Sequence, residues 1–179
     1  MKKKVIDPVK IIPEEIQFRW LGIEDEKSEE LSIFFELNTD EKYISHGEVI
    51  DGRAISLIEW KNNLNEVMRR EFRDILSGSS MKNIYSQICI CTQDHKTIGL
   101  AIVEFKNDTK VAILEDIIIE KQLRKKKLGS LLLNWLEKEI ISKGMSFIFM
   151  ESGIRNKKTH DFFHKNGYRQ SSIIMVKKL

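Results

Sequence analysis

The sequence predicts a mixed α/β domain with a mostly antiparallel central sheet and helices on both of its faces. Strand-like and helix-like segments follow one another along the 179 residues, with no linker, repeat or low-complexity segment between them. Residues 111–150 contain a strand, a helix and a second strand, the pattern of a crossover between parallel neighbours. The chain length and a hydrophobic content of 41% fit one domain with its own core.

The first strand of this crossover and its helix are marked by two different apolar patterns. Ile117, Ile118 and Ile119 form a β-branched run that is typical of a strand buried on both faces. Apolar residues then recur at intervals of three and four, which is typical of an amphipathic helix: Leu128, Leu131, Leu132, Trp135, Leu136 and Ile140. The strand is therefore expected to end near Glu120 and the helix to begin near Lys127.

A basic loop connects this strand to the helix, and it predicts an anion-binding site. At a helix start the first N–H groups have no intrahelical partner and carry the positive end of the helix dipole. Gly129 leaves room for a ligand close to the main chain, and Ser130 offers a hydroxyl group. Four cations surround this position and favour a multiply charged anion such as a pyrophosphate: Arg124, Lys125, Lys126 and Lys127.

The remaining segments give the order of elements along the chain. The first half predicts a strand at 16–21, a helix at 25–37, an irregular polar loop at 38–53 and a helix at 54–76. Three antiparallel strands are expected next, at 84–91, 98–105 and 111–119. After the crossover helix, we expect a parallel strand at 146–150, a short helix at 156–166 and a final hairpin formed by 168–170 and 173–176.

Two motifs resemble those of the GNAT superfamily of N-acyltransferases. The loop resembles the pyrophosphate loop of the family, Arg/Gln-x-x-Gly-x-Gly/Ala, with Lys127 at its usual first glycine. The segment from Asn156 to Tyr168 resembles the family's Asn-x-x-Ala-x-x-Leu-Tyr-x-Lys-x-Gly-Phe, with Phe163 at the tyrosine. The resemblance covers the chain after residue 14 and implies the GNAT fold, with residues 1–13 as an N-terminal extension and 14–179 as the N-acetyltransferase domain.

The resemblance also implies a cosubstrate, acetyl-CoA, and a set of site residues. Glu115 is the expected general base and Asp116 the second choice, because Asp116 points to the opposite face of the strand unless a bulge intervenes. The cofactor-binding residues would be Ile117, Ile118, Ile119, Arg124, Lys125, Lys126, Lys127, Leu128, Gly129, Ser130, Asn156 and Phe163. Phe163 has no proton to give to the departing thiolate, so water or another residue takes that role, or the thiolate leaves unassisted.

Charge is distributed unevenly along the chain. Twelve acidic and three basic residues lie between 14 and 51, while 121–127 carries five cations and no anion. This polarity suits a protein that receives a polyanion at one mouth and a cationic acceptor at the other, although the acidic residues also fit a solvated surface. A net charge of +3 is too small to indicate nucleic acid.

The cysteines, the absence of long apolar runs and the histidines indicate where the protein is located and whether it binds a metal. Cys89 and Cys91 lie two apart on an expected strand, which suits small core residues and a reducing cytoplasm. No apolar run is long enough for a membrane span, and no signal peptide is expected. His160 and His164 share a helix face but lack further ligands, so no metal site is expected.

These observations predict an acetyl-CoA-dependent N-acetyltransferase of the cytoplasm that acts on a primary amine. The expected acceptor is a small cationic molecule, such as a polyamine or an aminoglycoside, or a basic peptide, and a homodimer is an open alternative to a monomer. Neither nucleic acid nor membrane is expected as a partner. One competing interpretation is an acyl-CoA-binding module with little turnover, because Lys127 and Phe163 replace the usual glycine and tyrosine. Another is nucleic-acid binding through residues 121–127.

Overall fold

The computed structural model describes residues 16–78 and 83–177, so the expected N-terminal extension at 1–13 lies outside the described residues. Its centre is a five-stranded sheet in the order β1-β4-β5-β6-β7. The strands are β1 (Gln17–Trp20), β4 (Ile84–Gln93), β5 (Lys96–Lys106), β6 (Val111–Ile119) and β7 (Phe147–Met150). Neighbouring strands are antiparallel except β6 and β7, which are parallel, so the predicted mostly antiparallel sheet is confirmed.

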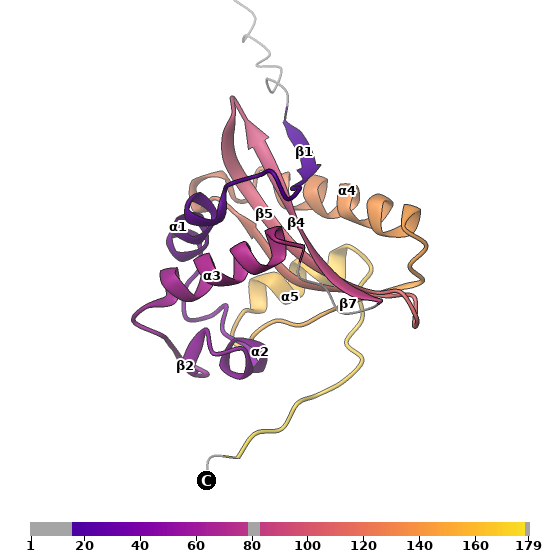
Figure 1. Cartoon of the computed structure of the whole chain (residues 1–179). Coiled ribbons are helices and arrows are strands. Elements are labelled where there is room, and N and C mark those ends of the chain that lie inside the picture. Colours follow the sequence, from indigo (N-terminus) through magenta and orange to yellow (C-terminus); the bar gives the residue numbers. More distant parts are fainter. Residues whose placement is uncertain (1–15, 79–82, 178–179) are drawn as a thin grey trace, which may run out of the picture.

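Helices cover both faces of this sheet (Figure 1). The first face carries α1 (Ser28–Asn38) and α3 (Leu64–Leu76), and the second carries α4 (Leu128–Ser142) and α5 (Lys157–Lys165). Each pair of helices packs on its own apolar cluster, because successive strand residues point to opposite faces. Among the described residues no helix is both long and apolar enough to cross a membrane.

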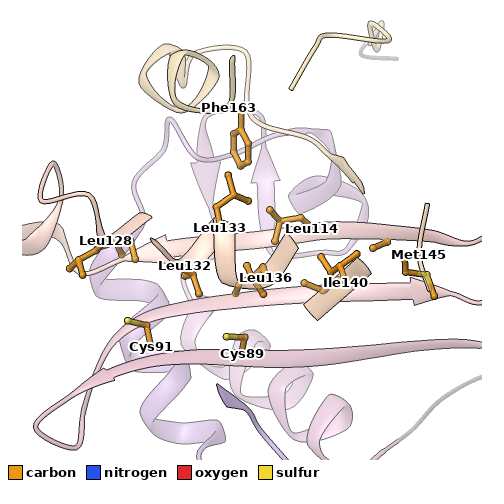
Figure 2. Packing of buried hydrophobic residues seen from close by; sticks show 14 of the residues in the cluster. Cys89, Cys91, Leu114, Leu128, Leu132, Leu133, Leu136, Ile140, Met145 and Phe163 are labelled. Atoms are coloured by element: carbon orange, nitrogen blue, oxygen red, sulfur yellow. The ribbon is translucent and has the colours of Figure 1, made fainter. Parts of the chain in front are cut away.

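The core between the sheet and α4 contains the leucines of the predicted helical stripe. Leu132, Leu133 and Leu136 are at most 1% exposed, and Figure 2 shows them with Phe163 of α5 beside Leu133. Both cysteines point into the same layer, where they are buried and free. The prediction that they are small core residues is therefore confirmed.

The predicted helix at 54–76 is wrong in its first ten residues. Ala54–Ser56 (β2) and Glu59–Trp60 (β3) form a two-stranded antiparallel sheet, and the helix begins at Leu64. Leu57 and Ile58, whose spacing from later apolar residues fits a helical stripe, are 39% and 63% exposed. Apolar spacing alone does not separate a hairpin from a helix, and here the hairpin is fixed by contacts of Arg53 that are distant in sequence.

Two other segments also differ from the prediction. The loop at 38–53 contains a short helix, α2 (His46–Ile50), which starts with a capping box formed by Ser45 and Glu48. The expected hairpin at 168–170 and 173–176 is not formed, because residues 168–177 have no strand assignment. The predicted crossover is confirmed, since β6 ends at Ile119 and β7 pairs with it in parallel.

A buried ion-pair cluster around Arg53 joins α3 to β6. The Arg53 side chain is 4% exposed; its Nε donates to Glu71 Oε2 at 2.9 Å and its Nη1 to Asp116 Oδ2 at 3.0 Å. Burial lowers the pKa of this guanidinium, but Asp116 and Glu71 more than compensate, and the net pKa is raised. The cation therefore stays charged and pairs with both carboxylates.

Replacing Arg53 by methionine is expected to lower the free energy of unfolding by about 3–5 kcal/mol, because the buried Asp116 and the partly buried Glu71 lose their cation. The matched control is Arg19→Met, which removes the ion pair with Asp25 at the surface, where the Arg19 side chain is 48% exposed. Its expected cost is at most about 1 kcal/mol. Urea denaturation of both variants measures the difference, and equal losses would contradict the assigned role of Arg53.

Candidate active site

A β-bulge in the middle of β6 sets the direction of the two candidate carboxylates. Ile102 of β5 pairs with Asp116, but the next residue, Val103, pairs with Leu114, so Glu115 is an extra residue in β6. Leu114 packs in the α4 core, whereas Asp116 contacts Tyr43 and Arg53 on the α1/α3 side. The bulge considered in the sequence analysis is thus present, and Asp116 turns away from α4.

Asp116 is enclosed and fully hydrogen-bonded. Its side chain has no exposed surface, Tyr43 Oη donates to its Oδ1 at 2.5 Å, and Arg53 Nη1 donates to its Oδ2. Burial, together with the charge of Asp116, raises the pKa of Tyr43 well above its usual value. Tyr43 therefore keeps its proton, and Asp116 holds Tyr43 and Arg53 in place.

Glu115 is in a different environment, although it is the adjacent residue. Burial, with the nearby charge of Asp116, raises the pKa of Glu115 to about 7. Within the described residues its carboxylate has no hydrogen-bond partner, since none of the side-chain bonds or ion pairs involves it. A carboxylate of this kind takes up or releases a proton near neutral pH, which general acid–base chemistry requires.

The first of two hollows beside Glu115 lies where β6 and β7 separate. The pairing of these strands ends at Leu114 and Met150, and beyond these residues the two chains diverge. We call the space between them the splay hollow. It is lined by Tyr43, Glu48, Leu114, Glu115, Ile117, Met150, Glu151, Ser152, Asn156, Thr159 and Phe163.

The segment around α2 forms one wall of the splay hollow and is tied to the end of β7. Glu151, one residue after β7, accepts hydrogen bonds from Ser45 Oγ and from the Gly47 N–H, the latter at 3.0 Å. Its other oxygen lies 2.9 Å from His46 Nδ1. Gly153 permits this approach, because a Cβ there would lie 2.2 Å from the carbonyl oxygen of Ile44.

The second hollow, which we call the acidic cleft, lies on the α3 side of the sheet. It is lined by five carboxylates and two guanidinium groups: Asp51, Glu71, Asp74, Glu104, Glu115, Arg53 and Arg70, with Val67, Ile75 and Ser86 between them. Arg53 is already balanced by Glu71 and Asp116, so the remaining groups leave an excess of negative charge. A cleft of this composition favours a cation.

The basic loop between β6 and α4 keeps several main-chain donors free. Lys127, the N-cap residue of α4, makes no side-chain bond to the first turn, and the first intrahelical bond runs from the Leu131 N–H to the Lys127 carbonyl at 3.0 Å. The N–H groups of Leu128, Gly129 and Ser130 thus precede the hydrogen-bonded part of the helix. The start of α4 therefore provides the main-chain N–H groups that the predicted anion site requires.

The cations of this loop have different roles in the structure. Arg124 Nε donates to the carbonyl of Ile119 at 3.0 Å, and its Nη2 donates to the carbonyl of Asn38, so its guanidinium anchors the loop. Lys125, Lys126 and Lys127 are exposed. Lys125 and Lys127 have φ values of 65° and 66°, a left-handed conformation that glycine adopts most easily. Lys127 thus has a backbone conformation that a glycine would adopt without strain.

The other predicted cofactor residues divide between the two faces of the sheet. Ile117 and Ile119 belong to the α4 side, and Ile117 lines the splay hollow. Ile118, 2% exposed, is buried on the α1/α3 side, and Leu128 is 7% exposed in the core, so its side chain has a packing role. At Gly129 an added Cβ would be 3.6 Å from the ring of Phe162, which is an ordinary van der Waals contact.

Residues of α5 complete the splay hollow. Asn156, the N-cap residue of α5, uses no side-chain bond for capping and lines the hollow, as does the buried ring of Phe163. His164 Nδ1 lies 3.2 Å from the carbonyl of Tyr168. In the described part of the chain no three His, Cys, Asp or Glu side chains are grouped closely enough to hold a metal ion.

The sequence analysis did not single out Arg53, Glu71, Asp74 or Glu104. The i, i+3 spacing of Glu71 and Asp74 was a signal, but it is shared by any solvated helix face. From the segment predicted as a polar loop, 38–53, Asp51 and Arg53 line the acidic cleft, while Tyr43 and Glu48 line the splay hollow.

Comparisons with known proteins agree with this geometry. An aminoalkylphosphonate N-acetyltransferase of Salmonella typhimurium is 22% identical over 120 residues, which cover 64% of this chain and 77% of that protein. The PaiA N-acetyltransferase of Thermoplasma acidophilum, solved with coenzyme A, superposes with a TM-score of 0.64 at 18% identity, over 89% of this chain and 93% of that one. An aminoglycoside acetyltransferase from an uncultured soil metagenomic sample, solved with sisomicin, superposes with a TM-score of 0.58 at 10% identity. The superposition covers 92% of this chain and 96% of that one.

The family assignment comes from a model of the acetyltransferase (GNAT) family, which matches residues 51–168, more than half of the chain. The matched range contains α3, the strands β4–β7, the basic loop and α5. The chain therefore belongs to the GNAT family and is an acetyl-CoA-dependent N-acetyltransferase.

Proposed function

We propose that this protein transfers the acetyl group of acetyl-CoA to a primary amine of a small, multiply charged cation, with Glu115 as the general base. The observation that carries this proposal is the position of Glu115, whose carboxylate borders both the splay hollow and the acidic cleft. Acetyl-CoA bound in the splay hollow and an amine bound in the acidic cleft would therefore meet at Glu115.

The residues of this chain fit acetyl-CoA in two places. The free N–H groups of Leu128, Gly129 and Ser130, with Lys125, Lys126 and Lys127 around them, would hold the pyrophosphate. Ile117, Asn156 and Phe163 in the splay hollow would contact the acyl arm. When bound, acetyl-CoA supplies a thioester carbonyl and a thiolate leaving group.

Glu115 and the backbone of β6 have separate tasks in the transfer. The carboxylate of Glu115 accepts a proton from the acceptor ammonium, which leaves a neutral amine with a free electron pair. Backbone N–H groups of β6 beyond Leu114, near Ile117, would donate to the negative charge that develops on the carbonyl oxygen. The new C–N bond forms as the C–S bond breaks, and the nitrogen gives its second proton to the departing thiolate, directly or through water. No tyrosine serves as the donor, because Tyr43 is held by Asp116 and Phe163 has no hydroxyl.

The acidic cleft narrows the choice of acceptor among the kinds that the relatives' names indicate. An aminoalkylphosphonate carries an anionic group beside its amine, which the carboxylates of this cleft would repel. A polyamine or an aminoglycoside carries further ammonium groups, which the same carboxylates would attract. We therefore propose a polycationic acceptor, bound by Asp74 and Glu104 while its reacting amine lies at Glu115.

The acceptor preference can be measured as release of the CoA thiol. We expect kcat/KM for polyamines and aminoglycosides to exceed that for aminoalkylphosphonates by at least about tenfold, since one hydrogen bond to a charged group is worth about 1.5–3 kcal/mol. Asp74→Lys should raise KM for the polycation several-fold with little change in kcat. Glu66→Lys, on an exposed part of α3 outside the cleft, is the control. A preference for aminoalkylphosphonates would refute the proposed acceptor class.

The role of Glu115 predicts a pH dependence with a defined sign. Below a pH of about 7 Glu115 holds its proton and cannot accept another, so the wild-type rate should rise as the pH increases through this value. Glu115→Gln should lower kcat by about 10²–10⁴-fold and remove this rise. Its melting temperature should not fall at pH 8, because an amide avoids the burial of a charge.

The control for this variant is Glu120→Gln, at the end of the same strand, where the carboxylate pairs with Lys96 at the surface. It should keep both the rate and the pH profile. Unchanged activity of Glu115→Gln at pH 8 would exclude Glu115 as the base.

The charge and the conformation of Lys127 can be separated by two substitutions. Lys127→Gly and Lys127→Ala remove the same charge, but only glycine relieves a φ of 66°. The free energy of unfolding of the glycine variant should be about 1 kcal/mol higher than that of the alanine variant. Both should raise KM for acetyl-CoA by a similar factor; a rise in the alanine variant alone would show that loop conformation, and not charge, controls binding.

A further inference from the structure

The splay hollow joins the two faces of the sheet, and its two ends differ in chemistry. Phe163 at one end belongs to the α4 core, whereas Tyr43 at the other end packs against the α1/α3 core. The end at Phe163 also contains Ile117 and Asn156, which would contact the acyl arm of acetyl-CoA. The end at Tyr43 contains the carboxylate of Glu48.

Glu48 is buried without a cation. It is only 6% exposed, and its Oε2 accepts a hydrogen bond from the Ser45 N–H at 2.6 Å. Within the described residues no ion pair includes Glu48, and no residue other than Ser45 donates to its carboxylate. Burial raises the pKa of Glu48, because its charged form has lost water without gaining a positive partner. A cation bound beside Glu48 would offset this cost.

The hydroxyl group of Tyr43 presents a hydrogen-bond acceptor to the same end of the hollow. Its proton is donated to Asp116 Oδ1 at 2.5 Å, so the oxygen still has an electron pair for another donor. In the part of the chain that the structure describes, no residue donates to this oxygen. Glu115, which lines the hollow as well, also lacks a donor. Tyr43, Glu48 and Glu115 thus give the hollow three acceptor groups.

We propose that Glu48 is a further substrate-binding residue, which together with Tyr43 and Glu115 accepts the three N–H bonds of the reacting ammonium group before transfer. This inference rests on the proposed function, in which the amine reaches Glu115. A primary ammonium has three N–H donors, and the three acceptor groups satisfy all of them. The space suits a group of this size, because the hollow has a volume of about 20 Å³ and about 10–15 Å³ is enough for one water molecule.

This arrangement makes the site selective for primary amines. A secondary ammonium has the same charge but only two N–H bonds, so one acceptor group loses its partner and an alkyl group lies against it. A hydrogen bond to a charged group contributes enough that the loss of one lowers affinity about tenfold or more. The acidic cleft recognises charge and would not distinguish the two kinds of amine.

The first test compares two amines of equal charge, butane-1,4-diamine and N,N′-dimethylbutane-1,4-diamine. Their affinities for the wild-type protein saturated with CoA are measured by isothermal titration calorimetry, so that binding is observed without transfer. We expect the primary diamine to bind at least about tenfold more tightly than the methylated one. Equal affinities would overturn this inference alone, whereas binding of neither diamine would overturn both the inference and the proposed polycationic acceptor.

The second test removes the charge of Glu48 and keeps its contact with Ser45. Glu48→Gln should retain the fold, since glutamine also completes a capping box, and its melting temperature checks this. We expect this variant to bind the primary diamine at least about tenfold more weakly and to lose most of the preference over the methylated diamine. Glu41→Gln, in the same segment but exposed and outside both hollows, is the control. Wild-type affinity and preference in Glu48→Gln would refute the role of Glu48.

Discussion

The buried guanidinium of Arg53 is the contact on which the arrangement of the active site depends. It pairs with Glu71 of α3 and Asp116 of β6, so one side chain fixes the helix, the strand and the β2–β3 hairpin that begins beside it. Buried charges are tolerated only when they are paired, and each of the two carboxylates in this cluster is paired with Arg53. The bulge in β6 turns Asp116 toward Arg53, and the same bulge leaves Glu115 as the extra residue.

Adjacent carboxylates thereby acquire different chemistry. Asp116 has a cation and a hydroxyl group as partners, whereas Glu115 has the burial but no partner, and burial raises its pKa to about 7. Glu115 titrates near neutral pH because it is buried without hydrogen-bond donors, whereas its neighbour Asp116 accepts bonds from Tyr43 and Arg53. The charge of Asp116 raises the pKa of Glu115 further, and the charge of Arg53 lowers it in part.

The sequence predicted the parts of the fold that local patterns determine. The strands and the crossover from Val111 to Met150 were placed within a few residues, because alternation and the leucine stripe persist over many residues there. The hairpin at 54–60 was missed, because it depends on Arg53 meeting Glu71 and Asp116, which are remote in sequence. The acidic cleft was missed for the same reason: its carboxylates come from α3, β5 and β6 and are brought together only by the fold.

The opposite charges on the two sides of Glu115 attract the two proposed substrates more strongly than the acetylated product. The basic loop at the start of α4 suits a polyanionic cosubstrate, and the acidic cleft suits a polycationic acceptor, so the two are drawn to different mouths of one site. Acetylation converts an ammonium group into a neutral amide, and the product therefore carries one positive charge fewer than the acceptor. The carboxylates of the cleft attract the product less strongly than the acceptor, and the electrostatic attraction that favours binding before transfer is reduced after it.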